Sequence, residues 1–309
     1  MTAPKPVLVA IVGPTAVGKT ALALELAHRF PLEVVSADSR QVYRGMDIGT
    51  AKPTQAERTA VPHHVIDVVE PDEPYTLAGY RRDALAAIVA VQQRRRLPVL
   101  VGGTGLYYRA VTSGMQIPEV APDPAYRATL EAQVIAEGYE ALHRVLAARD
   151  ATAATAIDPR NVRRVIRALE VQHVTGRAFS QQAEPVAPPF HFITLGLSLD
   201  RAILYRRIDQ RVDAMMAAGL LDEVERLHAR GYGWSLPSMS GIGYRQLGEH
   251  LRGERTLGEA IDRIKLDSHA YVRRQYTWFR KEPGIEWHDS AALQAALGDL
   301  SHRIESLFA

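Results

Sequence analysis

The chain has 309 residues, which is enough for one large or two modest domains with a full hydrophobic core. Its 37 lysine and arginine residues almost balance its 35 aspartate and glutamate residues, so the net charge of +2 does not by itself identify a nucleic-acid binder. The absence of cysteine excludes disulfide bonds, thiol catalysis and cysteine-ligated metal sites.

The first apolar run, residues 7–12, is much shorter than the roughly 20 residues of a membrane-spanning helix. It has no signal-peptide cleavage pattern. We therefore expect a soluble protein of the cytoplasm that has no membrane partner.

Short apolar runs rich in β-branched residues alternate with helical patterns along much of the chain. The runs are VLVAIV (7–12), LEVVSAD (32–38), HHVIDVV (63–69), LPVLVGG (97–103) and FITLGLSL (192–199). Alternation of this kind predicts an α/β fold in which helices wrap a parallel sheet.

A different pattern interrupts this alternation. Two proline-rich stretches, residues 117–124 and 184–190, bracket a segment, 126–182, that has helical periodicity and no strand signal. We therefore predict an α/β core made of residues 1–116 and 190–309, and an all-helical insertion domain made of residues 117–189.

A glycine-rich loop follows the first expected strand and opens the first expected helix. Its sequence, GPTAVGKT, satisfies the pattern GxxxxGK[ST] and predicts a P-loop NTPase-like core. Backbone N–H groups and the helix N-terminus would surround a phosphate, Lys19 would add a full positive charge, and the Thr20 hydroxyl can bind Mg²⁺. The predicted phosphate-binding residues are Gly13, Pro14, Thr15, Ala16, Val17, Gly18, Lys19 and Thr20.

The sequence lacks one part of an ATP-hydrolysing site. A nucleotide hydrolase needs a strand that ends in a metal-binding aspartate, but residues 97–103 lead into Thr104 without an acid. Asp38 instead ends an earlier strand, where a parallel sheet places it beside the loop; it could also simply cap the next turn. Asp67 competes as a metal ligand, although its apolar surroundings favour a structural role. The loop is therefore expected to bind phosphates, and release of diphosphate as a leaving group stays open.

Arginine is concentrated in three segments. Arg160, Arg163, Arg164 and Arg167 share one face of an expected helix inside the insertion. Residues 201–211 are also arginine-rich, and residues 271–281 interleave arginine with aromatic side chains. Arginine with aromatic residues suits RNA, because it combines phosphate pairing with base stacking. A solvated helix face and ordinary core packing are the alternatives.

Seven segments occur together and in order along the chain. They are GPTAVGKT, SADSRQVYRGMDIGTAKP (36–53), PHHVID (62–67), LVGGTGLYYRA (100–110), RRVIRALEV (163–171), GYRQL (243–247) and RRQYTWFRK (273–281). This set resembles the tRNA dimethylallyltransferases, also called tRNA isopentenyltransferases. The resemblance covers nearly the whole chain, and the segment at 36–53 is not a generic nucleotide-binding motif.

The resemblance implies transfer of a dimethylallyl group from dimethylallyl diphosphate to N6 of adenine 37 in tRNAs that read codons beginning with U. The phosphate loop would hold the diphosphate that is released. Among the implied catalytic residues, Asp38 would be the general base, while Lys19 and Arg211 would bind the diphosphate. Thr20, the fourth catalytic residue, would serve Mg²⁺ and the leaving group.

The resemblance also implies where tRNA binds. The helical segment 126–182 would grip the anticodon stem-loop. The implied tRNA-contacting residues are Asp38, Ser39, Arg40, Gln41, Thr104, Arg127, Arg163, Arg164, Val165, Ile166, Arg167, Ser240, Gly241, Ile242, Gly243, Tyr244 and Arg245. We expect Mg²⁺ as cofactor and a monomeric protein.

Three other functions remain as alternatives. A small-molecule kinase would share the phosphate loop but would leave the arginine-rich insertion without a purpose. A transferase that prenylates free AMP or ATP would share the core chemistry, although the basic insertion argues against it. A non-catalytic RNA-binding module would need neither Asp38 nor the GK[ST] ending.

Overall fold

The computed structural model describes residues 6–182, 186–188 and 190–308, and the chain divides into two units. Unit 1 contains residues 1–76, 80–111 and 189–309, and unit 2 contains residues 77–79 and 112–188. Of the predicted domains, residues 1–5 and 309 of the core and residues 183–185 and 189 of the insertion lie outside the described residues.

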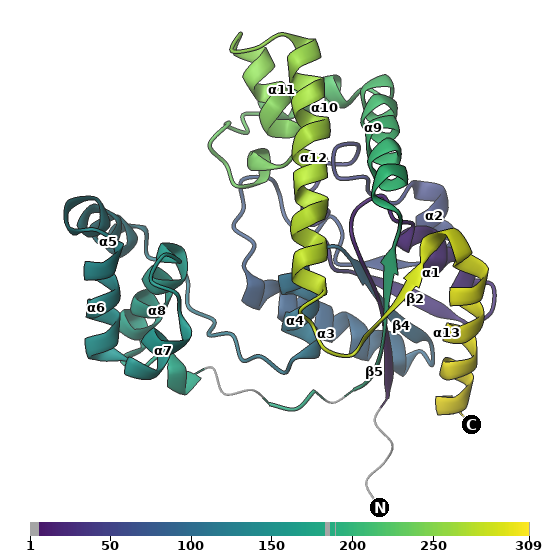
Figure 1. Cartoon of the computed structure of the whole chain (residues 1–309), viewed down its shortest axis with the longest axis horizontal. Coiled ribbons are helices and arrows are strands. Elements are labelled where there is room, and N and C mark those ends of the chain that lie inside the picture. The colour runs from purple at the N-terminus through teal and green to yellow at the C-terminus, as the bar shows by residue number, and fades with distance from the viewer. Residues whose placement is uncertain (1–5, 183–185, 189, 309) are drawn as a thin grey trace, which may run out of the picture. The chain divides into compact units, whose positions relative to one another are not determined.

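A six-stranded sheet in which every neighbouring pair is parallel forms the centre of unit 1 (Figure 1). Its strands are β1 (Val7–Val12), β2 (Leu32–Ser36), β3 (His63–His64), β4 (Leu97–Gly102), β5 (His191–Ser198) and β6 (Ile285–Asp289), in the spatial order β3-β2-β4-β1-β5-β6. Strands β1, β2 and β4 are buried along their whole length, which explains their mostly apolar sequences; the buried Glu33 of β2 is paired with Arg94. The predicted α/β parallel sheet is confirmed.

Two strands differ from the sequence prediction. The run at 63–69 forms a strand only over its first two residues, because Val65 and Asp67 have φ angles of 61° and 56°, outside the extended region. Strand β6 was not predicted, because it is half polar and lies at the edge of the sheet.

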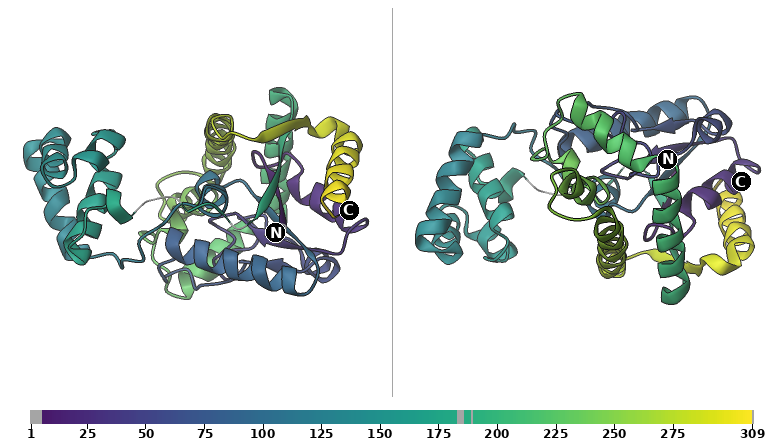
Figure 2. Two further views of the ribbon diagram at one scale, coloured as in Figure 1. Left: turned by 90° about the horizontal axis from the view of Figure 1, so that it is seen from below. Right: turned by 90° about the horizontal axis from the view of Figure 1, so that it is seen from above.

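Helices cover both faces of the sheet (Figure 2). On one face, α1 (Lys19–Ala27) and α13 (Leu293–Phe308) pack on a core that includes Val7, Val9 and Ile11 of β1. On the other face lie residues 80–93 of α3 (Leu77–Gln93), which bury Tyr80, Ala84, Ile88 and Val91. The remaining helices near the sheet are α2 (Gln55–Ala60) and α4 (Gly105–Thr112).

Four helices extend beyond the carboxyl ends of the strands (Figure 1). They are α9 (Arg201–Ala217), α10 (Leu220–Ala229), α11 (Tyr244–Leu251) and α12 (Leu257–Phe279). Two short 3₁₀ turns, Ser238–Ser240 and Ser290–Ala292, complete this part of unit 1. Because ligands of parallel sheets bind at the carboxyl ends of the strands, these helices are placed to wall a site. None of the described helices is long and apolar enough to span a bilayer.

Unit 2 is built from helices. They are α5 (Pro124–Glu137), α6 (Tyr139–Arg149), α7 (Ala151–Ala156) and α8 (Val162–Thr175), followed by a 3₁₀ turn, Ser180–Gln182. Their shared core contains Leu130, Leu142 and Leu146 together with Val165 and Ile166 of α8. The side chains of Val165 and Ile166, predicted to contact tRNA, therefore support the helix packing and are not at the surface.

A buried carboxylate holds unit 2 together. Glu170 has a side-chain exposure of 0% and accepts hydrogen bonds from Arg127 (2.7 and 2.8 Å), from Arg167 (2.6 Å) and from the Asp123 amide (2.8 Å). Burial raises the pKa of Glu170, but these hydrogen bonds outweigh it and lower the pKa to about 2. The guanidinium groups of Arg127 and Arg167 pair with Glu170 but keep part of their surface exposed, so their contact with tRNA stays a prediction.

Candidate active site

The phosphate loop connects β1 to α1, and two glycines give it its shape. Gly13 has a φ angle of 140°, and a Cβ atom there would lie 2.6 Å from the Leu197 carbonyl oxygen. Gly18, with a φ angle of 105°, begins α1 without any side-chain cap. The first N–H groups of α1 therefore have no capping side chain, as in an anion-binding helix N-terminus.

The loop lines a cavity of about 310 Å³, which we call the phosphate-loop cavity. Its walls come from the loop, from the carboxyl ends of β2 and β4, from the segment 50–53 and from α9. The polar and charged residues that line it are Thr15, Lys19, Thr20, Ser36, Asp38, Gln41, Thr50, Glu57, His63 and Arg211. The predicted phosphate-binding and catalytic residues Thr15, Lys19, Thr20, Asp38 and Arg211 are thus brought together.

Two basic side chains, Lys19 and Arg211, line this cavity without an ion pair to a described residue. Among the described residues, the Lys19 ammonium group donates hydrogen bonds only to the carbonyl oxygens of Gly13 (3.0 Å) and Pro14 (2.7 Å). Arg211 makes no hydrogen bond or ion pair with any described residue. Burial lowers the pKa of Lys19 to about 8, with Asp38 opposing this shift and Arg211 adding to it. Of the two carboxylates that line the cavity, Glu57 is held by Thr54 in the capping box of α2. An anionic ligand would therefore complete the pairing of Lys19 and Arg211.

Asp38 follows β2 and uses only one of its two oxygens. Its Oδ1 accepts a hydrogen bond from the Arg40 amide (2.8 Å), while Oδ2 has no partner among the described residues. Thr104 fixes the next residue, because its Oγ1 accepts a hydrogen bond from the Ser39 amide (3.0 Å). Asp38 therefore caps a turn, as the alternative interpretation proposed, and still offers a free oxygen to the cavity.

A second cavity, of about 540 Å³, adjoins the first, and we call it the helix-walled cavity. Both cavities are lined by Thr15, Asp38, Thr50, Ala51 and Arg211. The apolar residues of the helix-walled cavity include Ile208, Val212, Met215, Leu220, Ile242 and Ile264, and its polar residues include Ser240, Arg245, Arg263, Ser268, Tyr271 and Arg274. An apolar group and a polar ring could both be accommodated there, with Asp38 at the boundary between the two cavities.

Several residues predicted to contact tRNA have structural partners in unit 1. The Arg40 guanidinium group donates to the carbonyl oxygens of Pro237 (2.6 Å) and Ser238 (3.3 Å) and to Ser240 Oγ (3.3 Å). Gln41 accepts a hydrogen bond from Ser36 (3.0 Å) and donates to the carbonyl oxygens of the segment 50–51. Arg40 and Ser240 line the helix-walled cavity together with Gly241 and Gly243, while Gln41 lines the phosphate-loop cavity.

A buried glutamate that the sequence analysis did not identify anchors a wall of the helix-walled cavity, which Gly49 and Tyr244 line. Glu223 of α10 accepts hydrogen bonds from three successive amides, those of residues 47, 48 and 49, at 3.0, 2.8 and 3.2 Å. It also accepts one from the hydroxyl of Tyr244 (2.6 Å), a predicted tRNA contact whose exposed fraction is only 1%. The signal was present in the sequence, because Glu223 lies on the apolar stripe formed by Leu220, Val224 and Leu227.

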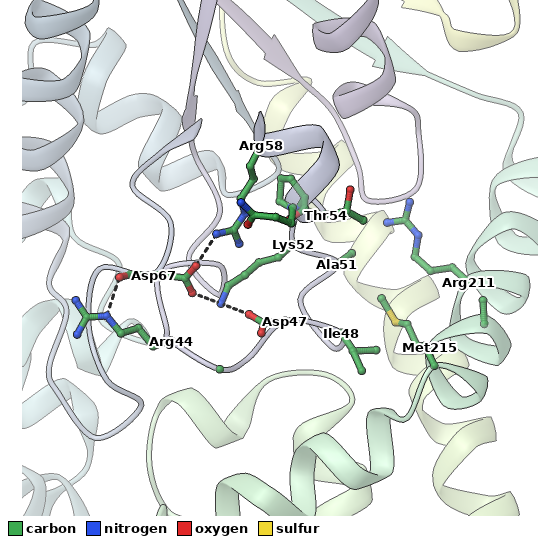
Figure 3. Close-up of a pocket in the computed structure, with 15 residues that line it drawn as sticks. Arg44, Asp47, Ile48, Ala51, Lys52, Thr54, Arg58, Asp67, Arg211 and Met215 are labelled. Atoms are coloured by element: carbon green, nitrogen blue, oxygen red, sulfur yellow. Dashed lines mark hydrogen bonds and ion pairs between the residues drawn. The ribbon is translucent and has the colours of Figure 1, made fainter. Parts of the chain in front are cut away.

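A third cavity, of about 840 Å³, is lined by Arg211 of α9 and by the segment 44–55 (Figure 3). Lys52, with 2% of its side chain exposed, pairs there with Asp47 (2.7 Å) and with Asp67 (2.6 Å). The other Asp67 oxygen pairs with Arg58 (2.7 Å). Burial raises the pKa of Asp67, but the hydrogen bonds from Lys52 and Arg58 outweigh it, so the pKa lies below its ordinary value. Both carboxylate oxygens of Asp67 are bound to basic side chains, which supports a structural role for Asp67 rather than a role as a metal ligand.

Comparison with known proteins identifies the family. The model of the IPP transferase family matches residues 41–282, and the model described as isopentenyl transferase matches residues 6–69. The chain belongs to the IPP transferase family. Over 278 residues it is 58% identical to the tRNA dimethylallyltransferase of Roseiflexus sp. strain RS-1, with 90% of this chain and 91% of the relative covered. Over 300 residues it is 56% identical to that of Roseiflexus castenholzii, with 97% and 96% covered.

Solved structures of family members have the same fold. The tRNA isopentenylpyrophosphate transferase of Bacillus halodurans is 44% identical, with a TM-score of 0.73 and coverage of 98% of this chain and 97% of that one. A eukaryotic dimethylallyltransferase described as acting on tRNA is 28% identical, with a TM-score of 0.80 and coverage of 94% and 75%. The predicted resemblance is confirmed, and the family member described here is a prenyl-transferring enzyme.

The lowered pKa of Lys19 predicts a proton uptake. Because the pKa of Lys19 lies at about 8, some of the Lys19 side chains are neutral near this pH, and a bound anion would raise the pKa so that they take up a proton. Binding of inorganic pyrophosphate at pH 8, measured by calorimetry in buffers of different ionisation enthalpy, should therefore take up more protons in the wild type than in Lys19→Arg. Arginine stays charged and is the matched control. Equal proton uptake by the two proteins would show that Lys19 does not have a lowered pKa in the free protein or does not contact the bound anion.

Proposed function

We propose that this protein transfers a dimethylallyl group from dimethylallyl diphosphate to N6 of adenine 37 in the anticodon loop of tRNAs that read codons beginning with U, releasing diphosphate. The observation that carries the proposal is the position of Asp38, whose free oxygen lies where the phosphate-loop cavity, with its unpaired Lys19 and Arg211, adjoins a half-apolar second cavity. Relatives that are 58% and 56% identical are named tRNA dimethylallyltransferases, which supports the choice of donor and acceptor.

In the proposed reaction, the lone pair of adenine N6 forms a bond to C1 of the donor while the C1–O bond breaks and its electron pair leaves with the diphosphate. The N6 proton passes to the free oxygen of Asp38. Loss of one preorganised donor to a developing anion typically costs about 2.7–4 kcal/mol, and Lys19, Arg211 and the loop amides supply several such donors. A general base contributes about 10²- to 10⁴-fold. Stabilisation of the leaving group is therefore the larger contribution.

The residues of the phosphate-loop cavity fit the expected Mg²⁺ ion. Among the described residues no cluster of three or more histidine, aspartate or glutamate side chains is placed to hold a metal. Mg²⁺ does not need one, because it keeps several waters and binds through few protein oxygens together with substrate phosphates. The Thr20 hydroxyl, which has no hydrogen bond to a described residue, would hold it. A bound Mg²⁺ would neutralise charge on the diphosphate.

The proposed grip on tRNA rests on three arginines of unit 2. Arg160, Arg163 and Arg164 are exposed and have no ion pair with a described residue, unlike Arg167. Phosphate contacts by these side chains would help to offset the few kcal/mol needed to take a base out of its stack, a cost that is lowest in a loop. We further propose that the enzyme works as a monomer in the cytoplasm.

The alternative enzymes predict different products. A kinase would transfer phosphate, and a nucleotide prenyltransferase would modify free AMP or ATP. The wild type should be incubated with dimethylallyl diphosphate, Mg²⁺ and an anticodon stem-loop RNA, AMP or ATP, and each product analysed by mass spectrometry. We expect prenylated adenosine in the RNA only. Prenylation of free nucleotide alone, or phosphate transfer without prenylation, would overturn the proposal.

The same assay tests Asp38. Asp38→Asn keeps an oxygen that can accept from the Arg40 amide but removes the base, so kcat should fall by about 10²- to 10⁴-fold while the affinities for RNA and pyrophosphate are largely retained at pH 7. The matched control is Asp200→Asn, because Asp200 likewise accepts backbone N–H bonds through Oδ1, at the start of α9, but lies outside both cavities. If Asp38→Asn turned over like the control, Asp38 would be only a capping residue.

The exposed arginines of unit 2 generate a prediction about salt. Each phosphate contact that is lost should reduce the steepness of the slope of log RNA affinity against log salt concentration by about 0.7 to 0.9. Arg163→Gln and Arg164→Gln should therefore weaken RNA binding, flatten its salt dependence and leave the KM for dimethylallyl diphosphate unchanged. The matched control is Arg144→Gln, an exposed arginine of α6 in the same unit. If the wild type and the three variants had the same salt dependence, Arg163 and Arg164 would belong to an ordinary solvated helix face that does not contact RNA.

A further inference from the structure

One buried side-chain amide joins α12 to the phosphate loop. Gln275 has an exposed fraction of 5%, and its Oε1 accepts a hydrogen bond from the Thr15 amide (2.9 Å). Its Nε2 donates to the carbonyl oxygen of Gly103 (2.9 Å) in the turn after β4. The packing around this amide is tight, since a Cβ atom at Gly103 would lie 2.3 Å from Gln275 Nε2.

The two segments bound by Gln275 belong to different parts of the site. Thr15 lines both the phosphate-loop cavity and the helix-walled cavity. Gly103 precedes Thr104, whose hydroxyl accepts a hydrogen bond from the Ser39 amide next to Asp38. A single amide therefore connects the phosphate loop with the turn that positions the proposed base.

Gln275 also lies on the stripe of α12 that faces the helix-walled cavity. Ile264, Ser268 and Tyr271 line that cavity, and Gln275 continues their spacing of three or four residues along one face of the helix. A molecule bound against this stripe would restrict the motion of α12. The restriction would pass through the hydrogen bond to the Thr15 amide into the phosphate loop.

We propose that Gln275 is a positioning residue that couples occupancy of the helix-walled cavity to the grip of the phosphate loop on diphosphate. The inference rests on the proposed function for the identity of the two ligands, an anticodon stem-loop RNA and a diphosphate. Its physical basis is that ordering α12 with one ligand lowers the entropy that must be lost when the loop closes on the other. Because linkage is reciprocal, each ligand then strengthens binding of the other by the same factor.

The test is a thermodynamic cycle with the full chain. The dissociation constant of inorganic pyrophosphate is measured by calorimetry with and without saturating anticodon stem-loop RNA, for the wild type and for Gln275→Met. Methionine fills a similar volume but neither accepts from Thr15 nor donates to Gly103. We expect RNA to tighten pyrophosphate binding at least 5-fold in the wild type and less than 2-fold in Gln275→Met. In Gln275→Met, kcat should fall by a larger factor than the KM for the donor changes.

Two further variants separate positioning from simple support of the fold. Gln275→Glu can still accept a hydrogen bond from the Thr15 amide but places a second oxygen against the Gly103 carbonyl, so it should also lose the coupling. It serves as the test variant if Gln275→Met does not fold. Thr194→Val removes a different buried hydrogen bond, the one with Tyr108 (3.2 Å), and should lower the melting temperature without changing the coupling.

The outcomes distinguish this inference from the proposed function. If the RNA does not bind to the wild type, the proposed function fails. If the RNA binds and is prenylated but does not change pyrophosphate affinity, or if Gln275→Met and Gln275→Glu keep the wild-type coupling, the role of Gln275 is overturned while the function stands.

Discussion

The structure of the site depends on positive charge that the protein itself does not neutralise. Elsewhere in the described chain, buried charges have partners: Lys52 pairs with two aspartates, and Glu170 pairs with two arginines. At the carboxyl ends of the strands, the only described hydrogen-bond acceptors of Lys19 are carbonyl oxygens, and Arg211 makes no hydrogen bond or ion pair with a described residue. Unpaired cations next to an uncapped helix N-terminus favour a bound anion. The neighbouring loops and helices hold this arrangement in place.

Two features turn a phosphate-binding core toward group transfer. The strand beside β1 that would carry a metal-binding acid, β4, ends in glycine, so the usual partner for hydrolysis is missing at that position. A second cavity with apolar walls adjoins the phosphate-loop cavity at Asp38. The anion held by the loop is then suited to depart as a leaving group, while the carboxylate is placed to accept a proton from the attacking amine. Glu223 holds residues 47–49 and Tyr244 at the helix-walled cavity, and Gln275 binds Thr15, which lines both cavities.

Much of the fold could be predicted, because its signals are local. Buried parallel strands have mostly apolar sequences, and the phosphate loop is defined by glycines at fixed spacing within eight residues. The helical spacing of Arg160, Arg163, Arg164 and Arg167 was also readable. What the spacing could not reveal is that Arg167 is paired with Glu170 and that Arg127 shares this partner from 43 residues away. Gln275 was missed for the same reason, since its partners lie 260 and 172 residues away in the chain.

The unpaired cation at Arg211 can be tested most directly by the affinity for inorganic pyrophosphate in the presence of Mg²⁺. A hydrogen bond to a charged group contributes about 1.5–3 kcal/mol, so Arg211→Gln should weaken pyrophosphate binding roughly 10- to 150-fold. Arg207→Gln is the matched control, because Arg207 is an exposed arginine one turn earlier on α9 that does not line either cavity. We predict a large loss for Arg211→Gln and none for Arg207→Gln. Equal affinities of the two variants for pyrophosphate would contradict the account.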